Sequence, residues 1–381
     1  MNRRFRHIAL WTLAAVMTVG CGSATEEETE LPVSPQPGSG TPIAFSGNLS
    51  DEGDVTRTDP TEPTGLETVL PEGNKKFRVW AYKNDASGGK QTVMEDYIVN
   101  WVANTAYTTT SNTHDWEYVN QQTGNDPSQT IKYWDWGVSA YRFFGYTGAS
   151  NYDDVSGNPA TIATVNVSGD PATITISGID ATNPSNVPYY SRLWYGTPSD
   201  DFFGKAVQLV FLQPVAKVRF LFVSADPVNV PIADMNLSDP TFKPTSTSQK
   251  IAVKGSVTVT YPLAGDIEES WDVTAGNDTG DKIDAFTQDY YEMPDDDNAR
   301  YWYTVLPAKN QASYTLSVKV NSDPEPKTCV VPAEYMNWLP GYQYTYVFKI
   351  NEEGDVALGE VMSAYTDWIK GKDADYTIYN W

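Results

Sequence analysis

Short runs in which apolar and polar residues alternate recur along most of the chain, and no other feature restricts its fold as strongly. In the run YQYTYVFKI, residues 342–350, every second residue is aromatic or apolar. Side chains of a strand point to opposite faces in turn, so this run predicts a half-buried strand. The preceding Pro340 and Gly341 predict the turn from which the strand begins.

Other runs predict further strands. Alternation is also clear at 253–261 and 314–320, and two alternating runs around Gly169-Asp170-Pro171 predict a hairpin. Residues 207–223 are apolar on both faces, as in a central strand or one that crosses between sheets, with a bulge or bend at Pro214. One further run is predicted to place a single set of side chains on one face, interrupted by Arg142: Trp134, Trp136, Val138, Ala140, Phe144 and Tyr146.

Beyond the first twenty residues no segment keeps a helical period, so the chain is predicted to be all-β and built from β-sandwiches. At 381 residues it is long enough for two cores. We predict an N-terminal β-sandwich domain over 41–225 and a C-terminal one over 226–381. Residues 21–40, rich in Glu, Pro, Gly and Ser, are predicted to be a linker.

The chain begins like an exported protein. Three arginines precede the apolar run IALWTLAAVMTV, which ends at Gly20 and Cys21, so residues 1–20 are predicted to be a signal peptide. The Gly-Cys pair is similar to the lipobox of bacterial lipoproteins, which predicts lipidation at Cys21. An ordinary cleaved signal is the alternative. The acidic run after Cys21 resembles a surface-export signal, or it is a charged tether.

The residue composition argues against several classes of function. A net charge of -23 argues against a nucleic-acid partner, which would need clustered Lys and Arg. Beyond the signal peptide the only histidine is His114, and no nucleotide-binding or nucleophile-elbow motif is present. We therefore predict no enzyme activity, no cofactor and no metal site. Asp295–Asp297 is interpreted as a solvated turn and Cys329 as a buried small hydrophobe.

Aromatic residues leave a binding function open. The chain has 24 Tyr and 12 Trp, and aromatic faces bind sugar rings. A glycan-binding surface lipoprotein is therefore the alternative function, with Trp116 and Trp194 as candidate contacts. A glycosidase is a third hypothesis, because carboxylates are plentiful, but the sequence selects no pair of them.

Several features together resemble the fimbrillin family, the subunits of type V pili. They are the Gly-Cys lipobox, TPIAFSG followed by VTRTDP, the aromatic run at 133–146, the run at 207–220, and WLPGYQYTYVFKI before a short terminal segment. The resemblance covers nearly all of the chain after the signal peptide. It rests on the order and spacing of these runs, since each alone is a general β signal.

The resemblance implies transthyretin-like sandwiches, a lipid anchor in the outer membrane, and a structural or adhesive role at the cell surface in a fimbria. It also implies that an Arg-specific protease removes the first strand, so that a donor strand from another pilin subunit can replace it. On this chain the removable strand is Ile43–Ser46, with Ile43 and Phe45 facing inward, and Arg57 is the predicted cleavage site. The donor strand is predicted at the end of the chain, around Tyr376 and Ile378, although this segment could equally fold onto its own chain. Surface receptors or glycans are further partners that this role implies.

Overall fold

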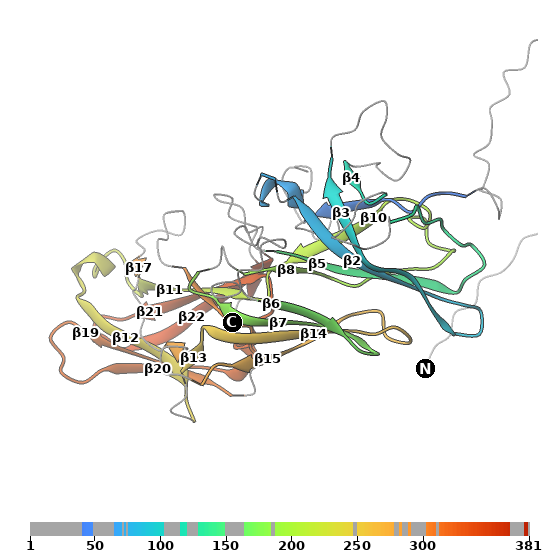
Figure 1. Cartoon of the computed structure of the whole chain (residues 1–381). Coiled ribbons are helices and arrows are strands. Elements are labelled where there is room, and N and C mark those ends of the chain that lie inside the picture. The colour runs from blue at the N-terminus through green and yellow to red at the C-terminus, as the bar shows by residue number, and fades with distance from the viewer. Residues whose placement is uncertain are drawn as a thin grey trace, which may run out of the picture. The chain divides into compact units, whose positions relative to one another are not determined.

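Nearly all regular structure in the described part of the chain is β-strand. The structure, a computed structural model, describes residues 40–48, 65–70, 72–73, 75–102, 115–119, 129–148, 164–183, 187–246, 250–277, 282–283, 289–290, 302–309, 312–365 and 377–379. Helical elements within these ranges are short 3-10 turns: η2 (Leu66–Thr68), η4 (Ile232–Asp234) and η6 (Ala333–Tyr335). The all-β prediction is confirmed (Figure 1). None of the described helical elements has the length and apolar character needed to cross a membrane.

The largest sheet contains most of the strands from the first half of the chain. Within the described residues it has eight strands in the order β1-β10-β8-β5-β2-β3-β4, with β9 paired to β5. These strands are β1 (Phe45–Asn48), β2 (Lys76–Asn84), β3 (Lys90–Trp101), β4 (Trp116–Glu117), β5 (Ala140–Thr147), β8 (Tyr189–Ser191), β9 (Trp194–Gly196) and β10 (Val207–Leu212).

The remaining described strands form four smaller sheets. One has the order β15 (Ser270–Ala275), β14 (Lys254–Tyr261), β7 (Ala172–Asp180) and β6 (Thr164–Ser168). Another has β17 (Asp289–Tyr290), β11 (Ala216–Ser224), β21 (Tyr342–Ile350), β22 (Val356–Tyr365) and β23 (Thr377–Tyr379), with β18 (Tyr303–Val305) also on β11. The others are β12 (Leu237–Pro244) with β19 (Tyr314–Val320) and β20 (Lys327–Val331), and β13 (Ile251–Ala252) with β16 (Lys282–Ile283).

The strongest sequence patterns gave the correct strands. β21 spans Tyr342–Ile350, and Tyr346, Phe348 and Ile350 are fully buried on one face. The hairpin around Pro171 is present as the antiparallel pair β6 and β7. The apolar run at 207–223 forms β10 and β11, which belong to different sheets, with Pro214 between them. Of the two arrangements expected for this run, the crossing between sheets is the one present, and it is made by two separate strands.

Two apolar clusters form the interior. The Phe45 core contains buried side chains of β1, β2, β5 and β10, among them Phe45, Phe77, Phe143 and Phe211. The Tyr346 core contains buried side chains of β7, β11, β12, β14, β19 and β21, among them Tyr346 and Phe220. β2 and β5 contribute to both, because their successive side chains point to opposite faces.

One predicted face is wrong. Trp134 belongs to the Phe45 core, whereas Phe144 and Tyr146 belong to the Tyr346 core. The reason is a local turn before the strand: Gly137 N–H donates to Asp135 Oδ1 at 2.9 Å, and β5 begins only at Ala140. This turn breaks the two-residue period on which the prediction depended. All eight residues of β5 are buried.

Strands from both sides of residue 225 share sheets. β7 pairs with β14 from Lys254↔Asp180 to Tyr261↔Ala172, and β11 pairs in parallel with β21. All the described residues belong to one compact unit, Gly40–Trp381. The division into domains at 41–225 and 226–381 stays a prediction.

Candidate functional site

The first described strand completes the edge of the eight-stranded sheet. β1 pairs in parallel with β10, starting at Phe45↔Val207, and Val207 N–H donates to the Ala44 carbonyl at 2.8 Å. Parallel neighbours are necessarily distant in sequence, so this pairing joins the two ends of the predicted N-terminal domain. We call residues 41–48 the first-strand segment.

The beginning of the first-strand segment has a second partner. Ile43 N–H donates to the Lys132 carbonyl at 2.8 Å, and Trp134 N–H donates to the Thr41 carbonyl at 2.9 Å. The Tyr118 hydroxyl donates to the Ile43 carbonyl at 3.0 Å and accepts from Lys132 N–H at 2.9 Å. Burial raises the pKa of Tyr118 well above its usual value, so the hydroxyl stays protonated and able to donate. The segment is therefore held from two directions.

The side chains of this segment are part of the core. Ile43 and Phe45 are both 0% exposed. The Phe45 ring makes edge-to-face contacts with Phe77, Tyr118 and Phe143 at centroid distances of 6.0, 5.7 and 5.9 Å. Full burial of an aromatic or branched aliphatic side chain contributes about 1.5–3 kcal/mol. These two residues are the anchors of the first strand.

Two other positions show how closely the segment fits. A Cβ atom added to Gly47 would lie 3.3 Å from Cβ of Leu66, the buried first residue of η2. Ser46 is also buried, and its Oγ has no hydrogen-bond partner in the described structure. A buried hydroxyl without a partner costs about 1–3 kcal/mol. The strand is thus well packed at Ile43 and Phe45, whereas the buried hydroxyl of Ser46 lowers its stability.

The C-terminal strand lies at the edge of another sheet. β23 pairs antiparallel with β22, with Ile378 opposite Met362, and it ends the order of its sheet. In this structure the terminal segment is therefore paired within its own chain, one of the two arrangements expected from the sequence. Tyr376 lies outside the described residues.

Other predicted site residues also lie outside the described ranges. The signal peptide, Cys21, Arg57, His114 and Asp295–Asp297 are among them, and their roles stay predictions. Within the described ranges, no group of three or more His, Cys, Asp or Glu side chains is placed to hold a metal ion. Cys329 is 9% exposed, and burial raises the pKa of its thiol. This agrees with its interpretation as a buried small hydrophobe.

The two candidate sugar-contacting tryptophans differ. Trp116 is 1% exposed and packs against Phe77 and Trp101, at 4.9 and 5.1 Å between ring centroids. It belongs to the Phe45 core and has no free face, so its selection as a glycan contact was wrong. Trp194, on β9, is half-buried and remains available at the surface.

Sequence reasoning missed the groups that hold the first strand. Neither Tyr118 nor the main chain of residues 132–134 carries a motif that points to residues 41–43. The signal that did exist was hydrophobic alternation at Ile43 and Phe45, which identified the anchors but not their partners.

The chain is similar to one protein family and to several solved structures. The fimbrillin-like family model matches residues 56–368. A fimbrial assembly protein of Parabacteroides distasonis is 11% identical, with 89% of this chain and 98% of that one covered and a TM-score of 0.33. A candidate cell adhesion protein of Bacteroides uniformis is 16% identical, with 88% and 100% covered and a TM-score of 0.37. None of the curated proteins compared matches the chain.

Proposed function

The chain belongs to the fimbrillin-like family, and from this premise we propose that it is a structural or adhesive subunit of a type V pilus. In this proposal, proteolysis removes the first strand and a strand of another subunit takes its place. The observation that carries the proposal is the position of β1, which is at once the first described strand, a sheet edge and a part of the Phe45 core. Removing such a strand opens both a row of main-chain groups and the pockets of its side chains.

The position of the predicted cleavage site in the sequence would allow the first-strand segment to be separated from the rest of the chain. Arg57 lies between Asn48, where β1 ends, and Gly65, where the described chain resumes. A cut at Arg57 would leave the first-strand segment attached only through non-covalent contacts. Its two anchors contribute about 3–6 kcal/mol together, whereas holding a separate peptide costs about 4–15 kcal/mol of lost freedom. These ranges overlap, so the cut strand is expected to be replaceable, and unpartnered Ser46 favours a better-fitting donor.

An Arg-specific protease tests this proposal directly. The mature protein would be digested, its new N-terminus sequenced, and its assembly followed by size-exclusion chromatography. Arg57→Lys is the matched control, because it keeps the charge but removes the cleavage site. We expect the native sequence to be cut after Arg57 and to form a series of stable oligomers, while the variant stays monomeric. Cleavage at Arg57 that leaves only monomers would contradict strand exchange.

The donor is proposed to be the C-terminal segment. Donation requires the pairing of Ile378 with Met362 to be exchanged for pairing with another subunit. A chain that ends at Tyr376 lacks β23 and should accept a donor strand but provide none. Added to an assembling mixture, this truncated chain should therefore shorten the oligomers. Unchanged oligomer length would exclude the segment as donor.

The cell-surface role is proposed to depend on a lipid at Cys21 and attachment to the outer membrane. The features that support it are the apolar run at 8–19 and the Gly20-Cys21 pair at its end. Labelling of expressing cells with a palmitate analogue should mark the native chain but not a Cys21→Ser variant. A native chain that is exported without label would refute the anchor.

A further inference from the structure

The eight-stranded sheet carries an irregularity beside β5. β8 and β9 both pair with β5, but the register changes between Tyr146↔Tyr190 and Phe143↔Trp194. One extra residue therefore lies on the β8–β9 side, which makes this region a β-bulge. A bulge leaves the extra residue unpaired, bends the strand and locally disrupts its pairing.

The interrupted edge is the one that faces β10. β10 pairs with β8 at Phe211↔Ser191, and Arg192 N–H donates to the Val210 carbonyl at 2.8 Å. Beyond this bond β10 continues as far as Val207 beside β1, while β9 pairs only with β5 among the described strands. β9 and β10 thus separate. We call the opening between Trp194–Gly196 of β9 and Val207–Val210 of β10 the seam.

The seam contains a cavity of about 760 Å³. This is within the range of small-molecule sites, roughly 300–1,000 Å³. Its walls come from β9, β10, the connection between them, and residues 267–269, with these side chains among its lining: Trp194, Tyr195, Phe202, Lys205, Gln208 and Ile267.

Apolar side chains are unusually accessible in the seam. Phe202 is 45% exposed and Ile267 is 54% exposed, although both are large hydrophobic residues. Phe202 packs edge-to-face against half-buried Trp194 at 5.4 Å between ring centroids. Aromatic faces with this accessibility suit the apolar C–H faces of sugar rings.

Polar and charged side chains surround these rings, and their positive and negative charges are equal in number. Arg192 and Lys205 are cationic, while Glu268 and Glu269 are anionic. Their formal charges sum to zero in a chain whose net charge is -23. Together with the exposed amide of Gln208, they provide donors and acceptors for hydroxyl groups without selecting a charged ligand.

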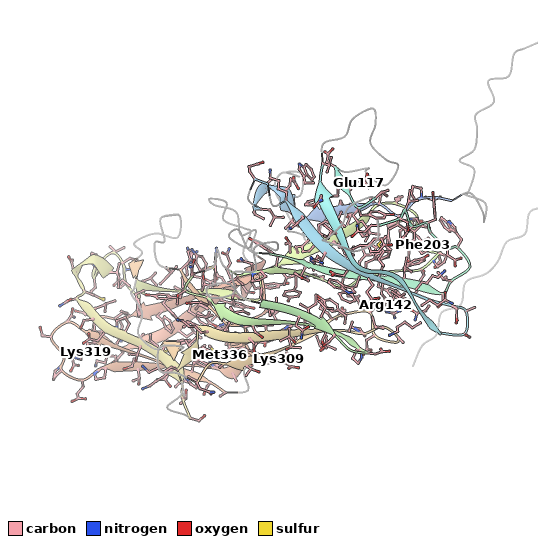
Figure 2. All side chains as sticks on the ribbon, in the orientation of Figure 1. Glu117, Arg142, Phe203, Lys309, Lys319 and Met336 are labelled. Carbon is pink, nitrogen blue, oxygen red and sulfur yellow. The ribbon has the colours of Figure 1, made fainter. Side chains whose placement is uncertain are left out.

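A buried arginine fixes two walls of the cavity. Arg142, labelled in Figure 2, is 4% exposed, and its guanidinium lies 4.9 Å from the centroid of the Tyr195 ring. Its Nη2 atom also donates to the Asp266 carbonyl at 3.5 Å. Glu269 Oε2 accepts from Leu193 N–H at 2.9 Å. The seam is therefore preorganised, which lowers the entropic cost of binding a ligand.

An added peptide strand fits the seam less well than a sugar. Strand addition requires a row of available main-chain donors and acceptors. Along this edge, Arg192 N–H is bonded to Val210 and Leu193 N–H is bonded to the Glu269 carboxylate. The edge that an incoming strand would need is thus partly occupied.

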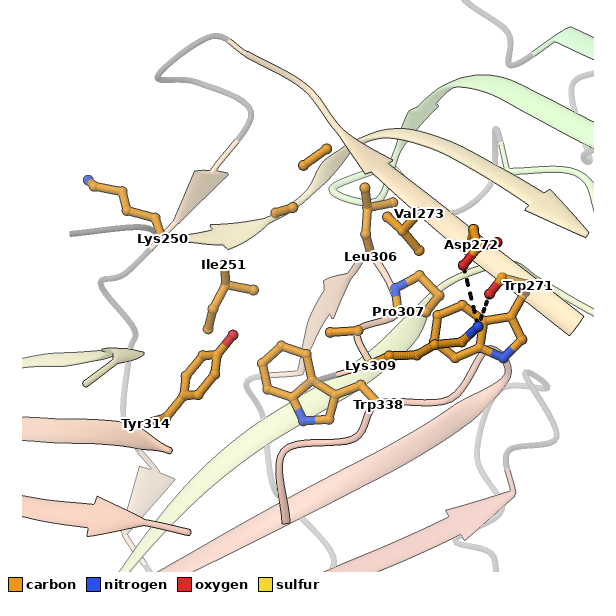
Figure 3. Close-up of a pocket in the computed structure, with 13 residues that line it drawn as sticks. Lys250, Ile251, Trp271, Asp272, Val273, Leu306, Pro307, Lys309, Tyr314 and Trp338 are labelled. Carbon is orange, nitrogen blue, oxygen red and sulfur yellow. Dashed lines mark hydrogen bonds and ion pairs between the residues drawn. The ribbon is translucent and has the colours of Figure 1, made fainter. Parts of the chain in front are cut away.

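A second cavity, shown in Figure 3, lacks available ring faces. Trp338 and Tyr314 are 1% and 5% exposed. The Lys309 ammonium lies 4.6 Å from the Trp271 ring centroid and also contacts the Trp271 carbonyl. Two rings are therefore buried and the third is covered by a cation, so stacking favours the seam.

We propose that the seam binds a short neutral oligosaccharide. The sugar rings pack on Phe202 and Trp194, and their hydroxyl groups bond to Gln208 and the charged side chains around the cavity. This deepens the adhesive role proposed above and rests on it for its biological use, but the binding itself requires neither cleavage nor strand exchange.

The test uses the uncut mature protein, so its result is separate from the assembly assay. An array of neutral, sulfated and sialylated glycans would be screened first, followed by titration calorimetry with the strongest neutral oligosaccharide. Phe202→Ala and Gln208→Ala remove an exposed ring and an exposed amide from the seam. Val330→Ala is the matched control, because Val330 is a 53% exposed hydrophobic residue outside the cavity lining.

We expect saturable binding of a neutral glycan that each seam variant weakens by about fivefold or more. This is the value of one good aromatic contact for Phe202→Ala and of one hydrogen bond for Gln208→Ala. Val330→Ala should bind like the native protein, and thermal unfolding would confirm that all variants are folded. No neutral glycan bound, or equal affinity in the native protein and both seam variants, would overturn the proposal. Binding of only acidic glycans, or of only an alternating Val-Thr peptide tested in parallel, would also overturn it.

Discussion

Replacement of Phe45 with alanine should release the first strand without unfolding the rest of the protein. The Phe45 ring is fully buried and has three aromatic neighbours, Phe77, Tyr118 and Phe143. Loss of a buried Phe side chain costs about 3–5 kcal/mol. Because β1 is an edge strand, we expect this cost to fall mainly on the free energy of opening the first-strand segment.

Amide hydrogen exchange measures that opening. Val207 N–H is bonded to the Ala44 carbonyl, so its exchange reports detachment of β1. A loss of about 3–5 kcal/mol corresponds to exchange at least 10²–10³-fold faster, at about 1.4 kcal/mol for each factor of ten. Amides of β21 should keep their native rates in Phe45→Ala.

Phe242→Ala is the matched control. Phe242 is also 0% exposed and also packs against aromatic rings, those of Phe220, Tyr314 and Tyr346 at 4.8, 5.3 and 5.5 Å between centroids, but it belongs to the Tyr346 core. It should lower the urea midpoint of global unfolding and leave the local opening at Val207 unchanged. Equal acceleration of exchange at Val207 and along β21 in Phe45→Ala would refute the idea that β1 detaches as a separate unit.

Three further predictions concern stability and reactivity. Gly255→Ala should lower the free energy of unfolding in urea by about 2–4 kcal/mol. The backbone φ of Gly255 is +156°, and the new Cβ would lie 2.2 Å from the Thr274 carbonyl oxygen. Gly265→Ala should cost less, because its new Cβ would have no heavy atom within 4 Å. Burial raises the pKa of Tyr314 to about 12. The folded state therefore keeps this proton above pH 10 while the unfolded state loses it, so stability should fall from pH 10 to pH 12 by about 1.4 kcal/mol per unit from this residue. Tyr314→Phe should remove that part of the slope, and an unchanged slope would contradict the assignment. Cys329 should react slowly with a thiol reagent in the folded protein and rapidly in denaturant, because it is buried and its thiol pKa is raised; equal rates would show that the site opens readily.

Strands with one buried face could be predicted from the sequence because their information is local. In β21 the turn at Pro340–Gly341 and the following alternation lie within a dozen residues, and both are in the structure. The same holds for the hairpin of β6 and β7. Where a turn interrupts the period, as between Asp135 and Gly137, the alternation continues in the sequence but no longer describes one strand.

The partners of a strand could not be predicted in this way. Phe45 pairs with Val207, and the two residues are separated by most of the sequence of the predicted N-terminal domain. Parallel strands are not joined by a short turn, so no local turn motif in the sequence indicates this pairing. The seam is a similar case. It depends on one extra residue on the β8–β9 side of β5, and on the Glu269 carboxylate, which accepts a hydrogen bond from Leu193 N–H. Both sites depend on register between distant segments, and a single sequence contains no direct record of register.

The separation of the two cores explains how strand exchange could be compatible with a stable subunit. Ile43 and Phe45 contribute to the Phe45 core, whereas none of the described side chains of residues 41–47 belongs to the Tyr346 core. Departure of β1 therefore exposes the Phe45 core while β11, β21 and the strands packed on them keep their buried contacts. A subunit built on a single core would risk global unfolding at the same step. The edge position of β1 confines the opening to one side of the eight-stranded sheet, and β10, the strand that pairs with β1, is the edge on which a new strand can dock.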